Sequence, residues 1–534
     1  MDTLNYVPGL NASHFGPIRP AQGTELLGRS RIILTTTAAV VGIMLWMSIS
    51  SWIFRPTLVT NARYVGYRSW LEPTWLLRLR WTWDARAILT EGYNQSKDMP
   101  YVIRRWDRDV TILPQKYLGD LRITPNTKLN AQIINFFNFS AEYTGLHFVR
   151  DNNLIFRALT NKLTAELPKY MDASKAVLDW TAPLELPSCS AWTVVKIEHA
   201  IRMIFSRLST NVVLGREALQ DAEWCHLAAL VSFNTMSTGL MLKKFPSWFR
   251  PLVARCLPTL YQLRESHVRS AELVAPILER WRTGQSTAED KQTLVHWMLE
   301  HAKEDEKTPM EMAFRVNATI LASVHTSGLT LTSILFDLCS HPEYFDILRE
   351  EIAEVMNELG PMGEAGPETL QRQWLPKLEK MDSFIAESLR MNHPVLFTPT
   401  RMAMEDITFK DGTHIPKNTW ISFPSANIMM DSEFYPDPKV FDGLRNWRKR
   451  QESPDQTNKH LATQATPSQL SFGYGNRACP GRFYSVSGLK MVLVKILQEY
   501  DIKHAGTRDP YRRLEEFSFI SMDAELMMKK RVVT

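Results

Sequence analysis

The sequence predicts a mainly α-helical protein with a minor β part, built as one large domain that follows a single transmembrane helix. Three observations support this prediction. Apolar residues recur at helical spacing through most of the chain, the strand-like stretches are few and short, and one uncharged apolar run lies near the N-terminus. Hydrophobic residues make up 44% of the chain and charged residues 22%, which excludes disorder, collagen and coiled coil as the main state.

Charge and cysteine content argue against two kinds of function. The 62 Lys and Arg residues nearly balance the 57 Asp and Glu residues, so the net charge is only +5. Such a weak bias argues against a nucleic-acid partner. The five cysteines are scattered without a Cys-x-x-Cys pair, and no His-Glu-x-x-His motif occurs. The sequence therefore predicts neither a disulfide framework nor a zinc site.

The uncharged run extends from Ile32 to Phe54. As a helix it would reach about 34 Å, enough to cross a hydrocarbon core of about 30 Å. A cleaved signal peptide is the alternative, but the run is too long and begins too far from the N-terminus. We expect a short lumenal segment over 1–31, a transmembrane helix over 32–54 and a large domain over 55–534.

Basic residues on both sides of the run predict its orientation. Three arginines precede it and five follow it within 26 positions. The positive-inside tendency therefore places the large domain in the cytosol. The first thirty residues would face the lumen, where Asn11-Ala12-Ser13 is a formal glycosylation site.

Within the large domain, helices should dominate. The apolar spacing predicts helices over 317–339, 377–391 and 489–500. Short strands are expected over 101–104, 407–409 and 419–423. No internal repeat or low-complexity linker interrupts the chain, which favours one domain despite its length.

Cys479 differs from the other cysteines because glycines surround it, in the sequence FGYGNRACPGRF over 472–483. Glycines let a backbone turn tightly and approach a flat object closely. Pro480 suits the first turn of a following helix, whose positive end would favour a metal-binding thiolate. Arg477 can pair with an anionic group on the same object.

Two other interpretations of this segment deserve comparison. Gly473-x-Gly475-x-x-Ala478 formally fits a dinucleotide fingerprint, but residues 466–471 do not form a buried strand and Cys-Pro interrupts the helix start. The other alternative is a structural cysteine buried in a turn, the usual fate of a free cysteine. For the cysteine alone, that second interpretation would be favoured.

The complete pattern, Phe472-x-x-Gly475-x-Arg477-x-Cys479-x-Gly481, resembles the heme-binding loop of the cytochrome P450 family. Two further family motifs precede it in the expected order. The first is Glu387-x-x-Arg390, and the second is the segment FDGLR that ends at Arg445. The resemblance covers residues 55–534 and implies a cytochrome P450-like fold. Phrases such as HPEYFDILREEI and FDGLRNWR are most similar to fungal biosynthetic members.

The resemblance implies a heme b cofactor (iron protoporphyrin IX) with Cys479 as the thiolate ligand of the iron. Phe472 would pack beside the thiolate, and Gly475 and Gly481 would shape the loop. Arg477 and Arg401 would hold heme propionates, although Arg401 is equally compatible with an ordinary surface arginine.

The resemblance also implies that Glu387, Arg390 and Arg445 form a buried ion network that supports the heme loop. The alternative is a solvated helical pair worth a few tenths of a kcal/mol. Ala322 and Phe397 are expected to line the substrate pocket.

The predicted long helix departs from the family pattern at one position. Family members carry an acid followed by Thr in this stretch, whereas this chain has His325 followed by Thr326. His325 could relay protons near neutral pH, or it could be a structural histidine bonded to a helix carbonyl. The Thr326 hydroxyl could assist oxygen activation, or bond back to its own turn.

The resemblance implies a single-pass monooxygenase of the endoplasmic reticulum membrane that uses O2 and NADPH-cytochrome P450 reductase. One oxygen atom would enter an apolar small molecule of fungal secondary metabolism, such as a terpenoid or indole-terpene. One alternative is a heme-thiolate isomerase or dehydratase that needs no reductase. Another, from a different class, is a non-catalytic membrane heme protein that senses or carries ligands.

Overall fold

The fold is described from a computed structural model, which covers residues 62–506 and 511–531 and four isolated positions nearer the N-terminus, 42, 46, 49 and 59. The expected lumenal segment and transmembrane helix lie outside the described residues, apart from three of those positions. The chain divides into two compact units, one of residues 1–56 and 69–77 and the other of residues 57–68 and 78–534. The features that follow belong to the second unit, except that the first turn of helix α2, residues 74–77, is counted with the first.

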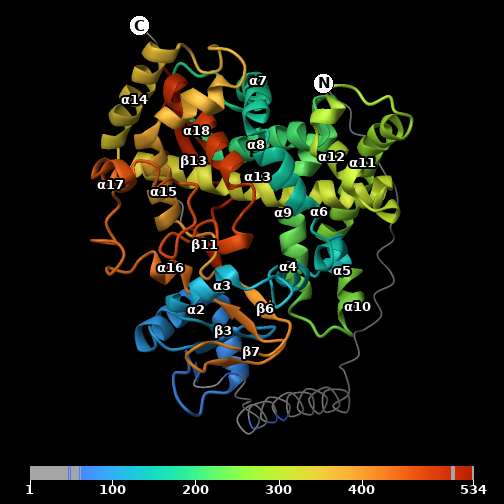
Figure 1. Ribbon diagram of the computed structural model, residues 1–534, viewed down its shortest axis with the longest axis vertical. Coiled ribbons are helices and arrows are strands. Elements are labelled where there is room, and N and C mark those ends of the chain that lie inside the picture. Colours follow the sequence, from blue (N-terminus) through green and yellow to red (C-terminus); the bar gives the residue numbers. More distant parts are fainter. Residues whose placement is uncertain are drawn as a thin grey trace, which may run out of the picture. The chain divides into compact units, whose positions relative to one another are not determined.

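Helices make up most of this unit, as the apolar spacing predicts (Figure 1). The longer ones are α2 (Thr74–Gln95), α7 (Leu167–Glu185), α8 (Ile197–Leu214), α9 (Ala222–Leu242), α11 (Pro258–Arg282), α13 (Pro309–Ser340), α14 (Glu343–Leu359), α15 (Glu379–Met391) and α18 (Arg482–Glu499). The shorter ones are α3 (Leu118–Ile123), α4 (Gln132–Asn138), α5 (Ala141–Thr144), α6 (Leu154–Ala158), α10 (Arg250–Ala254), α12 (Leu294–His301), α16 (Ser425–Ile428) and α17 (Arg445–Gln451).

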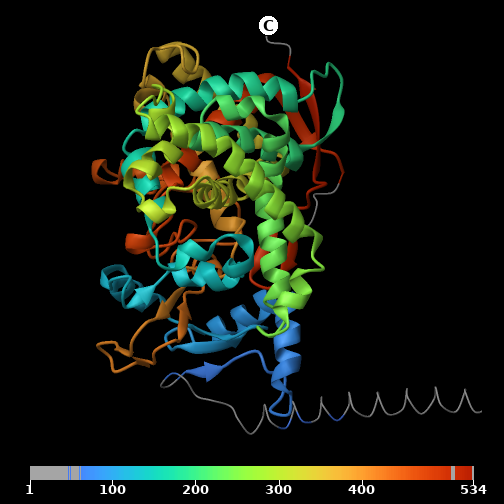
Figure 2. The same cartoon turned by 90° about the vertical axis from the view of Figure 1, so that its right-hand side faces the viewer.

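The strands are short, and within the described residues they form one larger sheet and three small ones. The six-stranded sheet has the order β1-β2-β3-β9-β6-β4, with β1 (Arg63–Tyr64), β2 (Tyr101–Arg104), β3 (Asp109–Ile112), β4 (Leu129–Asn130), β6 (Arg401–Ala403) and β9 (Trp420–Ser422). The small sheets pair β10 (Tyr500–His504) with β13 (Glu525–Lys530) and β5 (Thr193–Lys196), β11 (Arg512–Leu514) with β12 (Phe517–Phe519), and β7 (Ile407–Thr408) with β8 (His414–Ile415). The six-stranded sheet lies at one end of the unit, away from most of the helices (Figure 2).

Helix α13 runs through the core of the helical part, in contact with α8, α9 and α11. Its start is capped by Thr308, whose hydroxyl accepts a hydrogen bond from the Glu311 amide at 3.2 Å, and Pro309 fills the first turn. Most of α13 is buried, but Ala322 and Thr326 are exposed although they lie at its middle. Because these two residues are one turn apart, they mark one face of the helix that borders open space.

The C-terminal part of the unit carries the candidate cysteine on a rigid support. Helix α18 follows the cysteine loop, and eight of its apolar side chains between Val486 and Leu497 are buried in a large hydrophobic cluster. Helices α13 and α15 contribute to the same cluster. A loop that leads directly into such a helix is held in place by the packing of the core.

Candidate functional site

The loop around Cys479 depends on glycine at two positions. Gly473 and Gly475 have φ angles of +74° and +76°, in the left-handed region that glycine tolerates best. A Cβ atom on Gly475 would lie only 3.1 Å from the Cα of Arg122. The Cys479 amide donates a hydrogen bond to the Phe472 carbonyl at 2.8 Å, which closes the loop. The glycines therefore fix where the cysteine stands.

Cys479 faces an apolar cavity of about 180 Å³. Phe472 and Gly481 also line it from the loop side, while Ala322 and Thr326 line it from α13. The structure thus brings together residues from two segments that the sequence places more than 140 positions apart. The thiol and the Thr326 side chain border the same space, so a flat group bound there would have the cysteine as a potential ligand.

Burial raises the pKa of the Cys479 thiol above its ordinary value, although the thiol is exposed to the cavity. The backbone amides of Gly481 and Arg482 and the Arg482 guanidinium oppose this rise. Arg482 also donates a hydrogen bond from Nη1 to the Cys479 carbonyl at 2.8 Å. A metal cation in the cavity would favour the thiolate strongly, since a coordinating thiol is deprotonated.

Two arginines near the loop, Arg401 and Arg477, have no carboxylate partner among the described residues. Arg401 lies on β6, is 5% exposed, and has a buried Nη2 atom without a hydrogen-bond partner. Burial and the nearby Arg477 guanidinium lower the pKa of Arg401 to about 10. Over 62–506 and 511–531, neither arginine forms an ion pair with a carboxylate. A thiol that can ligate iron faces the cavity, and two guanidinium groups without a carboxylate partner among the described residues lie near it. These groups fit an iron porphyrin with two propionates.

Glu387, Arg390 and Arg445 meet in a buried ion network. Arg390 donates to both Glu387 carboxylate oxygens, from Nε at 2.8 Å and from Nη2 at 2.7 Å. The Arg445 Nε atom lies 3.4 Å from Glu387, whose carboxylate also accepts from the Asp442 amide at 3.0 Å. The network therefore ties α15 to the segment that precedes α17, and none of its members lines the cavity of Cys479.

His325 and Thr326 face different spaces. The Thr326 hydroxyl donates to the Ala322 carbonyl at 2.8 Å, which leaves its oxygen free to accept a hydrogen bond from the cavity. His325 lines a second cavity that does not include Cys479. Burial and the nearby Arg202 lower the pKa of His325 to about 4, so its ring is neutral at physiological pH.

Phe397 is buried against Trp81, with ring centroids 6.2 Å apart, and it does not line the cavity of Cys479. Other walls of that cavity come from α8, α12 and the segment after α6. Because these residues are dispersed over three separate elements, no local sequence motif indicates them. These residues are Leu159, Leu163, Ser209, Val212, Val213 and Leu294.

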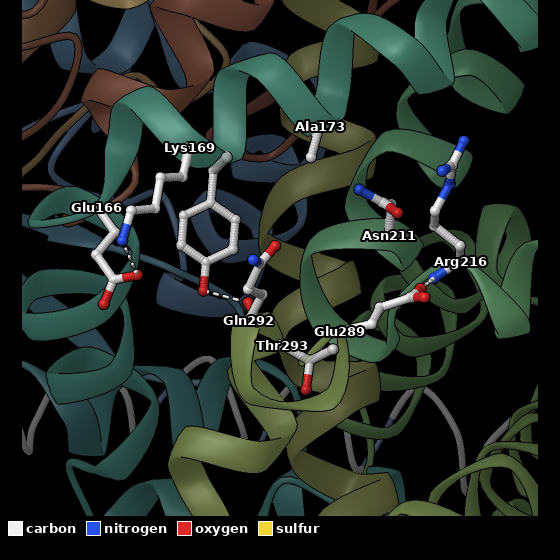
Figure 3. A pocket seen from close by; sticks show the side chains of 10 residues that line it. Glu166, Lys169, Ala173, Asn211, Arg216, Glu289, Gln292 and Thr293 are labelled. Atoms are coloured by element: carbon white, nitrogen blue, oxygen red, sulfur yellow. Dashed lines mark hydrogen bonds and ion pairs between the residues drawn. The ribbon is translucent and has the colours of Figure 1, made fainter. Parts of the chain in front are cut away.

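A smaller hollow of about 70 Å³ lies away from the cysteine (Figure 3). Some of its polar groups already have partners within the protein. The Tyr170 hydroxyl donates to the Gln292 carbonyl at 2.6 Å, and the Glu289 carboxylate accepts from the Arg216 amide. Its lining includes no cysteine or histidine, so it offers neither a thiolate nor an imidazole for catalysis.

Comparison with known proteins matches the chain over most of its length. A family model described as Cytochrome P450 matches residues 173–529. The chain is 34% identical over 498 residues to the cytochrome P450 monooxygenase sdnB of Sordaria araneosa, covering 91% of both chains. It is 35% identical over 480 residues to the monooxygenase ATR4 of Stachybotrys chlorohalonatus, covering 88% and 90%, and 33% identical over 475 residues to an ent-kaurene oxidase of Fusarium fujikuroi, covering 88% and 87%. The solved structure of retinoic acid-bound cyanobacterial CYP120A1 shares the fold, with a TM-score of 0.64 and 17% identity over 89% of this chain and all of the other.

Proposed function

The chain belongs to the cytochrome P450 family, and we propose that this monooxygenase oxidises an apolar terpenoid or indole-terpene intermediate of fungal secondary metabolism. Several similar proteins are fungal monooxygenases, and some are named ent-kaurene oxidases. The predominantly apolar walls around Cys479 support a substrate of low polarity.

The observation that carries this proposal is the meeting of Cys479 and Thr326 across one cavity, beside two arginines without acidic partners. When bound, heme supplies the activation of O2 and the transfer of one oxygen atom to a C–H bond. Cys479 would hold the iron through its thiolate, and amides at the start of α18 would temper the charge of the sulfur. Arg401 and Arg477 would hold the propionates by charge-assisted hydrogen bonds.

Thr326 is the residue of α13 best placed to handle protons in this cavity. Its hydroxyl hydrogen is committed to the Ala322 carbonyl, so its oxygen can accept a hydrogen bond from a water molecule. That arrangement would hold a water molecule in place beside the reacting group. His325 borders another cavity, so a proton relay through its ring would have to pass around the helix.

We further propose that the protein is a single-pass protein of the endoplasmic reticulum membrane whose large domain lies in the cytosol. The apolar run over 32–54 and the arginines that follow it support this placement. In the cytosol the domain would receive electrons from NADPH-cytochrome P450 reductase.

The carbon-monoxide difference spectrum of the reduced protein tests the proposal most directly. The wild type should bind heme and show the red-shifted Soret band of a thiolate ligand, and Cys479→Ala should lose it. Cys256→Ala, which removes an exposed cysteine outside the cavity, is the matched control and should keep the band. A wild type without heme, or a Cys479→Ala variant with an unchanged band, would refute the assignment.

Turnover measurements then separate the proposed reaction from its alternatives. Oxidised product should form only with NADPH and reductase. Product without reductase would indicate a heme-thiolate isomerase or dehydratase. A heme-loaded protein that oxidises none of a panel of terpenoid substrates would favour a sensor or carrier.

A further inference from the structure

A larger cavity, of about 400 Å³, borders another face of α13. Helices α8 and α9 and the C-terminal segment 512–523 form its other walls, and Figure 1 shows α8, α9 and α13 side by side. It shares no lining residue with the cavity of Cys479. The two spaces are therefore distinct, and the role proposed above leaves this second one unexplained.

A buried arginine stands in this cavity without adequate partners. Arg202 of α8 is 6% exposed, and its Nε and Nη1 atoms have no hydrogen-bond acceptor. Glu198, one turn earlier, approaches to 3.4 Å, but one of its carboxylate oxygens is also unpartnered, so the pair is poorly formed. Guanidinium groups do not lose their charge in proteins. A buried cation with free N–H groups therefore favours an additional anionic partner.

Glu198 is a weak counter-charge for the Arg202 guanidinium for a second reason. Burial raises the pKa of Glu198 to about 7, since desolvation outweighs the attraction of Arg202. Near neutral pH the carboxyl is therefore protonated in a large fraction of molecules. His325, which also faces this cavity, is neutral and has an unpartnered Nε2 atom. Neither neighbour supplies a stable negative charge for the guanidinium.

The rest of the cavity indicates the chemical class of the partner. Phe233 and Met236 of α9 and Phe519 of β12 give it apolar walls. At its rim stand the exposed Arg512 and Asp523, and Asp523 is paired with Lys196 outside the lining, at 3.0 Å. A carboxylate has the two oxygens that a planar guanidinium binds best. A volume of about 400 Å³ falls within the range of small-molecule sites.

We propose that this cavity is a binding site for an apolar carboxylic acid, with the carboxylate on Arg202 and the hydrocarbon body between α9 and β12. Two sources of such a ligand are a flexible fatty acid and a rigid carboxylated terpenoid. Both share the chemistry that the cavity recognises. The site is separate from the oxidation site, so it can fail while the assignment of Cys479 stands.

Equilibrium dialysis of the heme-loaded, full-length protein provides the test. The probes are octanoic acid, 1-octanol and dehydroabietic acid. Both dialysis chambers contain the same detergent, so that partition of a probe into micelles is equal for every variant compared. Arg202→Gln should weaken octanoate binding by about 10- to 100-fold, which corresponds to the loss of hydrogen bonds to a charged group. It should leave octanol binding unchanged. A preference for octanoate or for dehydroabietate identifies the source.

Two further variants protect this test against misfolding. Arg207→Gln removes a guanidinium from the same helix, but Arg207 is bound to Thr181 and Glu185 and does not line the cavity, so octanoate affinity should not change. Glu198→Gln should raise octanoate affinity severalfold, because it removes a competing carboxylate, and a gain of affinity cannot come from misfolding.

Several results would overturn the proposal. Equal octanoate binding by the wild type and Arg202→Gln, or a wild type that binds octanoate no better than octanol, would show that the arginine does not recognise the acid. A Soret shift on octanoate addition that persists in Arg202→Gln would place the acid at the heme instead. Loss of octanoate binding in Glu198→Gln would show that the glutamate is required rather than competing.

Discussion

Replacing Glu387 with Gln tests whether the buried ion network holds the heme loop in place. The substitution keeps the shape of the side chain and removes its charge. Arg390 and Arg445 would then remain as cations in a site where the side chains of Glu387 and Arg390 are only 2–3% exposed. Their other hydrogen bonds, such as those from Arg390 to the Met429 and Pro438 carbonyls, would not supply the lost charge.

The expected cost follows from this burial. Removing one partner of a buried ion pair costs about 3–5 kcal/mol, because the remaining charge stays desolvated. A domain is stable by only about 5–15 kcal/mol, so the variant should be strongly destabilised. The substitution leaves one acceptor oxygen for the Asp442 amide, so the cost comes from the two arginines that lose their counter-charge.

An exposed pair of the same chemistry provides the control. Glu368 accepts two hydrogen bonds from Arg372, at 2.7 and 2.9 Å, but the side chains are 31% and 65% exposed. Glu368→Gln should therefore cost no more than about 1 kcal/mol. Urea denaturation followed by circular dichroism measures the free energy of unfolding, and the pyridine hemochrome assay measures retained heme.

The result that would refute the reasoning is equal stability of the two variants. If Glu387→Gln lost no more free energy of unfolding than Glu368→Gln, the buried network would behave like a solvated pair. If Glu387→Gln kept full heme while losing stability, the network would support the fold but not the loop. An Arg390→Lys variant should be intermediate, since it retains the charge and loses the second hydrogen bond to Glu387.

Three further predictions concern single residues. Arg401→Gln should lower heme retention, because it removes a proposed partner of a propionate. The same variant should raise the unfolding midpoint of the heme-free protein, because it removes a buried cation that has no acidic partner. A lower midpoint of the heme-free variant would contradict this. Gly475→Ala should lose heme and cost about 1–3 kcal/mol, because alanine is strained at φ +76° and its Cβ would crowd Arg122. The control Gly119→Ala, in open space within α3, should be neutral or stabilising, and equal unfolding midpoints for the two would sink the argument. His325 has a folded-state pKa of about 4 against 6.5 when unfolded, so protonation favours the unfolded chain and stability should fall as the pH drops from 6.5 toward 4. His325→Asn should reduce this loss by about 1–3 kcal/mol in pH-dependent unfolding measurements, and an unchanged pH profile would show that the ring is not buried as described.

Much of the fold was predictable from the sequence because its signals are local. The apolar period that predicts helices over 377–391 and 317–339 corresponds to α15 and to most of α13. The strand expected over 101–104 coincides with β2. The glycine-rich segment around Cys479 predicts a tight loop because backbone conformation and helix starts depend on neighbouring residues. The transmembrane helix over 32–54 stays a prediction, since the described residues include only three of its positions.

Only the tertiary structure decided which side chains share a space. Adjacent residues of a helix point about 100° apart. His325 and Thr326 therefore face different cavities, although the sequence suggested a joint role. Phe397 lies against Trp81 in the core, where the sequence predicted a pocket wall. The unpartnered guanidinium of Arg202 carried no local signal, because its lack of an acceptor depends on what α9, α13 and the C-terminal segment place around it.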